Sequence, residues 1–225
     1  MHTFNNTLLR KYLFVASILI TAIVIYLISQ SYFDHAGKKI AAHLTNNDIY
    51  IASLIDSSDN HSAEYAKLKH LFIINKELKN SFYSVADRFN TFDSTYTFSL
   101  VYSSIIFGIL GFLLLKKGWD NTESYYLKAA FLCFFFITSF FGIIPKVFQS
   151  ELNYRKNYEK YNFFNAIQID IFNLSQDNQK FFANGQIDSI NVHINEIVNG
   201  IKSNQNIYFD KNIEAVPTNI QPTGN

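Results

Sequence analysis

The sequence predicts an all-α membrane protein with three transmembrane helices. It also predicts a helical bundle outside the cytoplasm, formed by the first loop and the C-terminal region. Three observations lead to this fold: long apolar stretches without charge, apolar spacings of three and four in the polar segments, and few helix breakers. Only 8 glycines and 3 prolines occur among 225 residues, which favours continuous helices.

The three apolar stretches cover residues 12–29, 96–115 and 129–144. A helix rises about 1.5 Å per residue, so about 20 apolar residues cross a hydrocarbon core of about 30 Å. The third stretch is the shortest, but residues 125–127 can extend it past Lys128, whose side chain can reach the interface. Burial inside a soluble protein is the alternative, and it is disfavoured because soluble helices seldom lack charge on every face.

The first stretch has features of a signal peptide, because Arg10 and Lys11 precede an apolar run. That run exceeds the usual apolar region of about 7–15 residues, and no small-residue cleavage site follows it. The sequence therefore predicts an uncleaved signal anchor.

The basic residues next to the stretches predict their orientation. The 1–11 tail is basic at its end, and the 116–128 loop carries Lys116, Lys117 and Lys128. Short loops rich in Lys and Arg stay in the cytoplasm, so segments 30–95 and 145–202 are expected outside it. The composition suggests a bacterial source. We therefore expect a multi-pass protein of the bacterial inner membrane, with its N-terminus cytoplasmic and its C-terminus periplasmic.

Segment 30–95 is expected to form a helical hairpin. One helix follows Gly37, a polar turn covers 57–62, and a second helix ends in a break at 90–95, where Asp93 or Ser94 is the expected cap. The second helix carries a seam with alternating spacings of three and four, made of Leu68, Leu71, Asn75, Leu78, Phe82, Val85 and Phe89. Asn75 either fixes the register of this seam or faces a wet edge of the bundle.

Segment 145–202 is expected to contribute further helices, after a kink or restart at Pro145. Its first helix carries an apolar and tyrosine stripe, with Tyr154, Tyr158, Tyr161, Phe164, Ile167, Ile171 and Leu174. The three tyrosines are either core residues or a partner-binding face, since Tyr is enriched in interfaces. A break at 175–178 and a short helix closed by Gly185 follow.

The isoleucines from Ile187 to Ile201 recur at spacings of three and four, which favours a helix over the strand that β-branched residues otherwise indicate. Residues 203–225 are expected to form a flexible tail.

Motifs for chemistry are missing from the sequence. The six histidines show no H-x-x-x-H or H-E-x-x-H spacing, and no nucleophile elbow or phosphate-binding glycine loop occurs. We expect no catalytic residues, no metal, no cofactor and no enzymatic activity. The net charge of +1 gives no basic footprint for nucleic acid. The single cysteine, Cys133, lies in the third stretch, so no disulfide is expected.

The apolar stretches contain no ionisable residue, which argues against ion transport. They do contain small residues at helix-packing spacing, namely Ser104, Gly108, Gly111, Thr138 and Gly142. These residues pack either within the hairpin of the second and third helices or against another membrane protein, including a second copy of the chain.

These features favour a non-enzymatic interaction protein with a protein partner and the lipid bilayer as its contacts. In layout, being small, with few crossings and without motifs, the chain resembles some bacterial membrane immunity proteins, which implies binding and neutralising a pore-forming or envelope-targeted toxin. The alternative is an accessory or structural subunit of a bacterial envelope complex. A membrane sensor and a small pore fit less well, because the cytoplasmic part is very small and the outer part is large.

Overall fold

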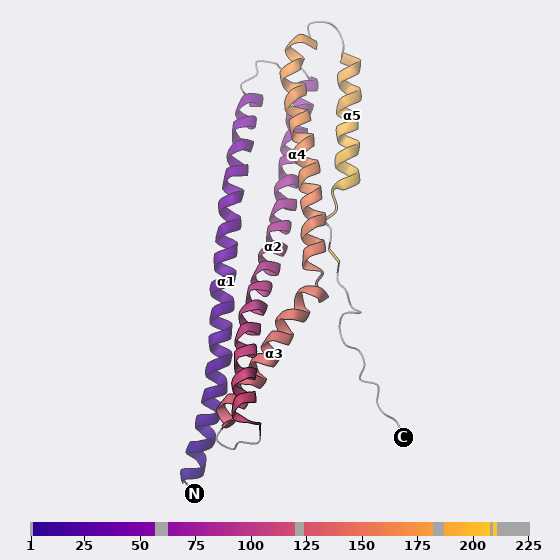
Figure 1. Ribbon diagram of the computed structural model, residues 1–225. Helices are drawn as coiled ribbons and strands as arrows, with labels where there is room; N and C mark the ends of the chain where they lie inside the picture. Colours follow the sequence, from indigo (N-terminus) through magenta and orange to yellow (C-terminus); the bar gives the residue numbers. More distant parts are fainter. Residues whose placement is uncertain (1, 57–62, 120–123, 182–186, 208, 211–225) are drawn as a thin grey trace, which may run out of the picture. The chain divides into compact units, whose positions relative to one another are not determined.

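The computed structural model describes residues 2–56, 63–119, 124–181, 187–207 and 209–210. These residues are almost entirely helical, which confirms the all-α fold. The helices are α1 (His2–Asp56), α2 (Ala63–Lys117), α3 (Tyr125–Val147), α4 (Ser150–Phe181) and α5 (Ile187–Asn204) (Figure 1).

The chain divides into two compact units, which are described separately here. Unit 1 comprises Met1–His35, Asn90–Glu151 and Asp210–Asn225, and unit 2 comprises Ala36–Phe89 and Leu152–Phe209. Helices α1 and α2 contribute to both units. Helix α3 belongs to unit 1, whereas α5 and nearly all of α4 belong to unit 2.

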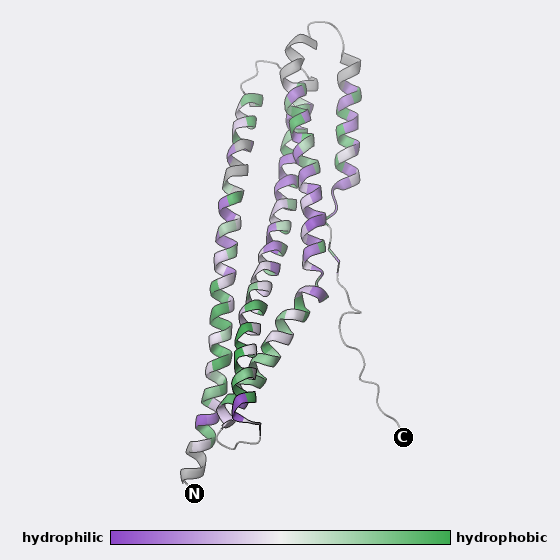
Figure 2. Cartoon of the chain, in the orientation of Figure 1, coloured by the Kyte–Doolittle hydropathy of each residue, from purple (hydrophilic) through white to green (hydrophobic). Residues whose placement is uncertain are grey.

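Three helical segments are long and apolar enough to cross a membrane: Thr7–Ile40, Tyr65–Lys117 and Tyr125–Ser175. In the most apolar window of each, only 6%, 17% and 11% of the residues are buried. Figure 2 shows apolar residues around α3 and the adjacent parts of α1 and α2, whereas α4 is more polar. A water-soluble protein would hide such surfaces, so the three helices are consistent with a multi-pass membrane protein.

Unit 1 packs α1, α2 and α3 together through aromatic contacts. The ring of Tyr26 on α1 lies 5.4 Å from Tyr96 on α2 and 6.0 Å from Phe141 on α3. Phe107 on α2 stacks on Phe131 of α3 at 4.6 Å. Edge and stacked ring pairs at these distances contribute dispersion and quadrupole attraction that does not depend on water.

Unit 2 has a conventional apolar core built from α1, α2, α4 and α5. Its centre is a stacked pair, Phe82 and Phe164, with ring centroids 5.1 Å apart and both side chains fully buried. The remaining buried core residues are Ile55, Tyr65, Leu68, Leu71, Phe72, Tyr161, Ile167, Ile171, Ile194, Ile197 and Ile201. Most of the inward positions predicted from the spacing on α2, α4 and α5 are therefore confirmed.

The predicted break after the first membrane segment is wrong, because α1 runs without interruption through Gly37. An isolated glycine costs a helix only about 1 kcal/mol relative to alanine. Here the carboxylate of Asp87 on α2 occupies the space that a Cβ at Gly37 would need. The glycine therefore permits a close approach of two helices rather than ending one.

The predicted break at 90–95 is also wrong, because α2 continues to Lys117. The hydroxyl of Thr95 donates to the backbone carbonyl of Thr91 at 2.7 Å, so the Thr95 side chain is satisfied by its own helix. Asp93 caps no helix here and instead accepts a hydrogen bond of 2.5 Å from Ser150 Oγ, at the start of α4.

Pro145 lies inside the last turn of α3, and the chain breaks slightly later, at Phe148 and Gln149. Gln149 adopts a positive φ of 44° before α4 begins at Ser150. The expected restart after Pro145 is thus found a few residues downstream.

The predicted break at 175–178 does not occur, because α4 extends to Phe181. The helix predicted from Ile187 onward is confirmed as α5. The expected turn at 57–62, the expected closure at Gly185 and most of the expected tail lie outside the part of the chain that the structure describes.

Candidate interaction site

Unit 2 contains a buried charged layer between three helices. Asp48 on α1, Lys79 on α2 and Gln168 on α4 are each almost completely buried. The ammonium group of Lys79 donates to Asp48 Oδ1 in a buried ion pair, and Gln168 Nε2 donates to the same oxygen at 3.0 Å. Burying two charges is costly unless they pair and gain further hydrogen bonds, and Gln168 supplies one of these bonds.

Asn75 extends this layer by one helical turn. It lies four residues before Lys79 on α2, and its Nδ2 donates to the carbonyl of Phe164 at 2.8 Å. Phe164 in turn lies four residues before Gln168 on α4. Residues four apart share a helix face, so one face of α2 contacts one face of α4, directly through Asn75 and through Asp48 in the case of Lys79.

Asn75 is fully buried, with 0% of its surface exposed, so the wet-edge interpretation is wrong. A register-setting role remains a prediction, and the bond to α4 supports it. Three acceptor oxygens of the layer have no hydrogen-bond partner among the described residues: Asp48 Oδ2, Asn75 Oδ1 and Gln168 Oε1. Unpaired buried acceptors lower the stability of the fold. A shift of one helix along another would break the bonds of Asp48 and Asn75 as well, and would lower the stability further. We therefore expect the layer to favour one alignment of α1, α2 and α4.

The three tyrosines predicted as a candidate binding face form a stacked row on α4. The ring centroids of Tyr154 and Tyr158 are 5.7 Å apart, and those of Tyr158 and Tyr161 are 5.5 Å apart. Tyr161 belongs to the core and contacts Tyr83 on α2 at 5.5 Å, whereas Tyr158 is 39% exposed. The row thus leads from the surface into the core, and only its outer members are accessible to a partner.

Burial has an electrostatic consequence at the inner end of this row. Burial, and secondarily the negative charge of Asp87, raises the pKa of Tyr83 to about 12. Burial likewise raises the pKa of Tyr161. Both phenols therefore stay neutral in the folded unit at physiological pH.

A groove of about 430 Å³ lies between α4 and α5 of unit 2. Apolar side chains, including the partly exposed Phe163, line it together with Asp170 on α4 and Glu196 on α5. His193 Nδ1 lies 3.1 Å from Glu196 Oε2. Helical spacing in the sequence did not predict this groove, because it marks the inward face of each helix but not the gap between two helices.

Gly200 allows α5 to approach α4 at this groove. A Cβ at this position would lie 3.4 Å from Phe163 Cζ and 3.5 Å from Ile167 Cδ1. These are contact distances, so a larger side chain would enter the space next to both residues.

The small residues predicted to pack the membrane helices separate into two groups. Gly111 lies against the ring of Phe131, and Gly142 lies against Leu100. Thr138 has a buried hydroxyl without a partner among the residues described. In contrast, Ser104 is exposed and nothing in unit 1 lies within 4 Å of a Cβ at Gly108. Packing inside the hairpin is thus observed for the first group but not for the second.

The inward face of α2 in unit 1 is a row of hydroxyl residues at spacing four, which the sequence analysis missed. Its members are all buried: Thr91, Thr95, Ser99 and Ser103. The sequence does indicate this row, because small residues recur at every fourth position and such residues allow close helix approach.

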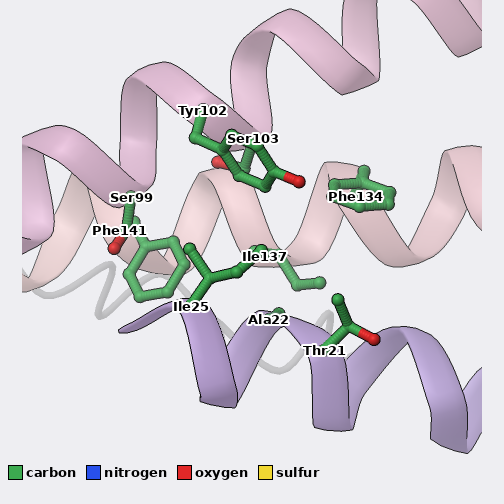
Figure 3. A pocket seen from close by; sticks show the side chains of 9 residues that line it. All are labelled: Thr21, Ala22, Ile25, Ser99, Tyr102, Ser103, Phe134, Ile137 and Phe141. Carbon is green, nitrogen blue, oxygen red and sulfur yellow. The ribbon is translucent and has the colours of Figure 1, made fainter. Parts of the chain in front are cut away.

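A small cavity of about 20 Å³ lies beside this row (Figure 3). Its lining comes from α1, α2 and α3, with Thr21, Ala22, Ile25, Ser99, Tyr102, Ser103, Phe134, Ile137 and Phe141. Ser99 Oγ has no hydrogen-bond partner among the described residues. The volume suits one water molecule and is too small for a substrate.

Within the described ranges, no three His, Cys, Asp or Glu side chains gather closely enough to hold a metal ion. No family model, curated protein or solved structure matches this chain.

Proposed function

We propose that the chain is a non-enzymatic interaction protein of the bacterial inner membrane, whose unit 2 lies outside the cytoplasm and binds another protein. In its most specific form, the proposal is an immunity protein that neutralises a pore-forming or envelope-targeted toxin. The distribution of Lys and Arg around the apolar helices supports the orientation.

The α4–α5 groove is the observation that carries this proposal. Its lining combines apolar side chains, including the ring of Phe163, with the exposed acidic side chains of Asp170 and Glu196. Apolar and aromatic centres with polar rims are typical of protein interfaces. The buried layer of Asp48 and Lys79 supports the same proposal, because a fixed helix alignment keeps such a surface preorganised.

Loss of protection tests the toxin-neutralising form. The gene is deleted in its natural host, and the cells are challenged with the toxins encoded beside it. We expect the deletion strain to lose survival and the wild-type gene to restore it. Unchanged sensitivity of the deletion strain would contradict the proposal.

Matched charge changes then locate the binding surface. Asp170→Lys reverses an exposed charge in the groove lining and should abolish complementation. Asn195→Lys also introduces a lysine, with a charge change of one rather than two, at an exposed position of α5 outside the groove lining, and should complement fully. Equal protein levels on immunoblots show that neither variant is degraded. If both variants protect equally, the groove is not the binding surface.

Reporter fusions test the orientation independently. Alkaline phosphatase, which is active only outside the cytoplasm, should be active when fused after Asn225 and inactive when fused after Lys117. The opposite pattern would place unit 2 in the cytoplasm.

A further inference from the structure

We propose that unit 1 binds the headgroup of an anionic phospholipid where α2 ends and α3 begins. Five cationic side chains gather at this end of the unit: Arg10, Lys11, Lys116, Lys117 and Lys128. This inference concerns unit 1 alone and does not depend on the proposed protein partner of unit 2.

Aromatic contacts bring α1 to this end of α3. Lys11 Nζ lies 4.2 Å from the ring centroid of Tyr125, the first residue of α3. One turn further along α1, Phe14 packs edge-on against Tyr126 at 5.0 Å. The ammonium group of Lys11 is thus held over an aromatic face rather than left to sample solvent.

A second cation near the start of α3 is held in the same manner. Lys128 lies three residues after Tyr125, hence on the same face of α3. Its Nζ lies 5.8 Å from the ring of Trp119, which follows α2. Lys11 and Lys128 are therefore two preoriented positive charges near the start of α3.

These charges are not neutralised by the residues that the structure describes. None of the five cations forms an ion pair within that part of the chain. The loop residues Asp120 and Glu123 lie outside it, and counting both still leaves a net positive charge at this end. A phosphodiester with its negative charge is the complementary ligand.

The apolar surroundings favour a lipid over free phosphate. Leu115, next to Lys116, is 85% exposed and offers an apolar surface to an acyl chain. Tyr and Trp prefer the headgroup level of a bilayer, and basic clusters beside membrane helices attract anionic lipids. The combination of rings, cations and exposed leucine matches a headgroup that is joined to acyl chains.

Lipid retention on the full-length protein tests the site. The protein is placed in nanodiscs of phosphatidylcholine with phosphatidylglycerol, then released and examined by native mass spectrometry. We expect phosphatidylglycerol to be retained several-fold over phosphatidylcholine. The double variant Lys11→Gln/Lys128→Gln should lose most of this preference, whereas Lys11→Arg/Lys128→Arg should keep it.

The matched control removes two exposed lysines of unit 2, as Lys67→Gln/Lys202→Gln, and should leave the preference unchanged. Inorganic phosphate added in excess should not displace the retained lipid. Equal retention of both lipids by wild type, or an unchanged preference in the Lys11/Lys128 glutamine variant, would overturn the proposal. Displacement by phosphate would assign the site to free phosphate instead. If the glutamine variant loses helical circular dichroism, the wild-type preference and the phosphate competition still decide.

Discussion

Units 1 and 2 share helices α1 and α2, yet the side chains that pack their helices together differ. The interior of unit 2 holds a stacked Phe82–Phe164 pair surrounded by isoleucine and leucine. In unit 1, the buried face of α2 is hydroxylic, whereas large side chains such as Leu115 and Phe136 are exposed. One helix, α2, therefore changes from an apolar inward face to a hydroxyl inward face along its length.

The contrast fits the proposed placement of unit 1 in lipid and unit 2 in water. In water, removing apolar surface from the solvent drives helices together. Lipid chains are as apolar as leucine, so helices in a bilayer associate through close packing of small residues and through hydrogen bonds. Thr95 and Ser103 satisfy their hydroxyls on carbonyls of their own helix, at 2.7 and 3.1 Å. The hydroxyl row thus lets helices approach while Thr95 and Ser103 keep their hydroxyls paired; Ser99 Oγ has no partner among the described residues.

The largest expected effect comes from the one buried ion pair described in unit 2. Lys79→Met leaves the carboxylate of Asp48 buried without its counter-charge, which should lower the free energy of unfolding by about 3–5 kcal/mol. Chemical denaturation in detergent, followed by far-UV circular dichroism, measures the change. The double variant Asp48→Leu/Lys79→Met should recover most of the loss, because it buries no unpaired charge. A single variant as stable as wild type would show that water reaches this layer.

Phenylalanine truncation compares the two interiors directly. Phe164→Ala removes a fully buried ring from unit 2 and should cost about 3–5 kcal/mol. Phe136→Ala removes a ring that is 67% exposed in unit 1 and should cost less than about 1 kcal/mol, since its neighbours there are lipid or detergent. Equal losses in the same denaturation experiment would mean that Phe136 is covered by protein, such as a second copy of the chain.

Adjacent serines test the hydroxyl row of unit 1. Ser103→Leu places a large side chain on the packed face of α2 and should cost about 1–3 kcal/mol. Ser104→Leu makes the same change one residue later, on an exposed position, and should be nearly neutral. Thermal unfolding of both variants in one detergent measures the difference. A larger loss for Ser104→Leu would reverse the assignment of the packed face.

Periodicity in the sequence was sufficient to predict the fold and much of the unit 2 core. Leu68, Phe82 and Phe164 are buried at positions that their spacing predicts, because a water-facing helix must alternate between apolar and polar faces. The predicted breaks at Gly37 and at 90–95 are wrong, because glycine and short polar residues do not always end a helix. Asp87 packs against Gly37, and Thr95 bonds to a carbonyl of its own helix, so the helices continue through both places.

The contacts that define the candidate sites could not be predicted in the same way. Lys79 is a polar residue next to the seam, and nothing in its neighbourhood in the sequence identifies Asp48 as its partner. In the membrane segments every face is apolar, so hydropathy does not distinguish the packed Ser103 from the exposed Ser104. The partner of Lys79 and the burial of Ser103 depend on how the helices pack against one another in three dimensions.

Alkaline pH should produce the smallest effect on unit 2. The pKa of Tyr83 is raised from 10.0 to about 12 in the folded unit, first by burial and then by Asp87. A raised pKa means that the stability from neutral Tyr83 is fully present below pH 10 and is lost as the pH rises toward 12. Because Tyr83 is partly exposed, this loss should be about 1 kcal/mol or less.

Tyr83→Phe should therefore become more stable relative to wild type between these two pH values, in denaturation curves recorded at each pH. Tyr50→Phe, which changes an exposed tyrosine of the same unit, should follow wild type. If Tyr83→Phe also follows wild type, water reaches the Tyr83 phenol in solution. Tyr83 would then lie outside the unit 2 core.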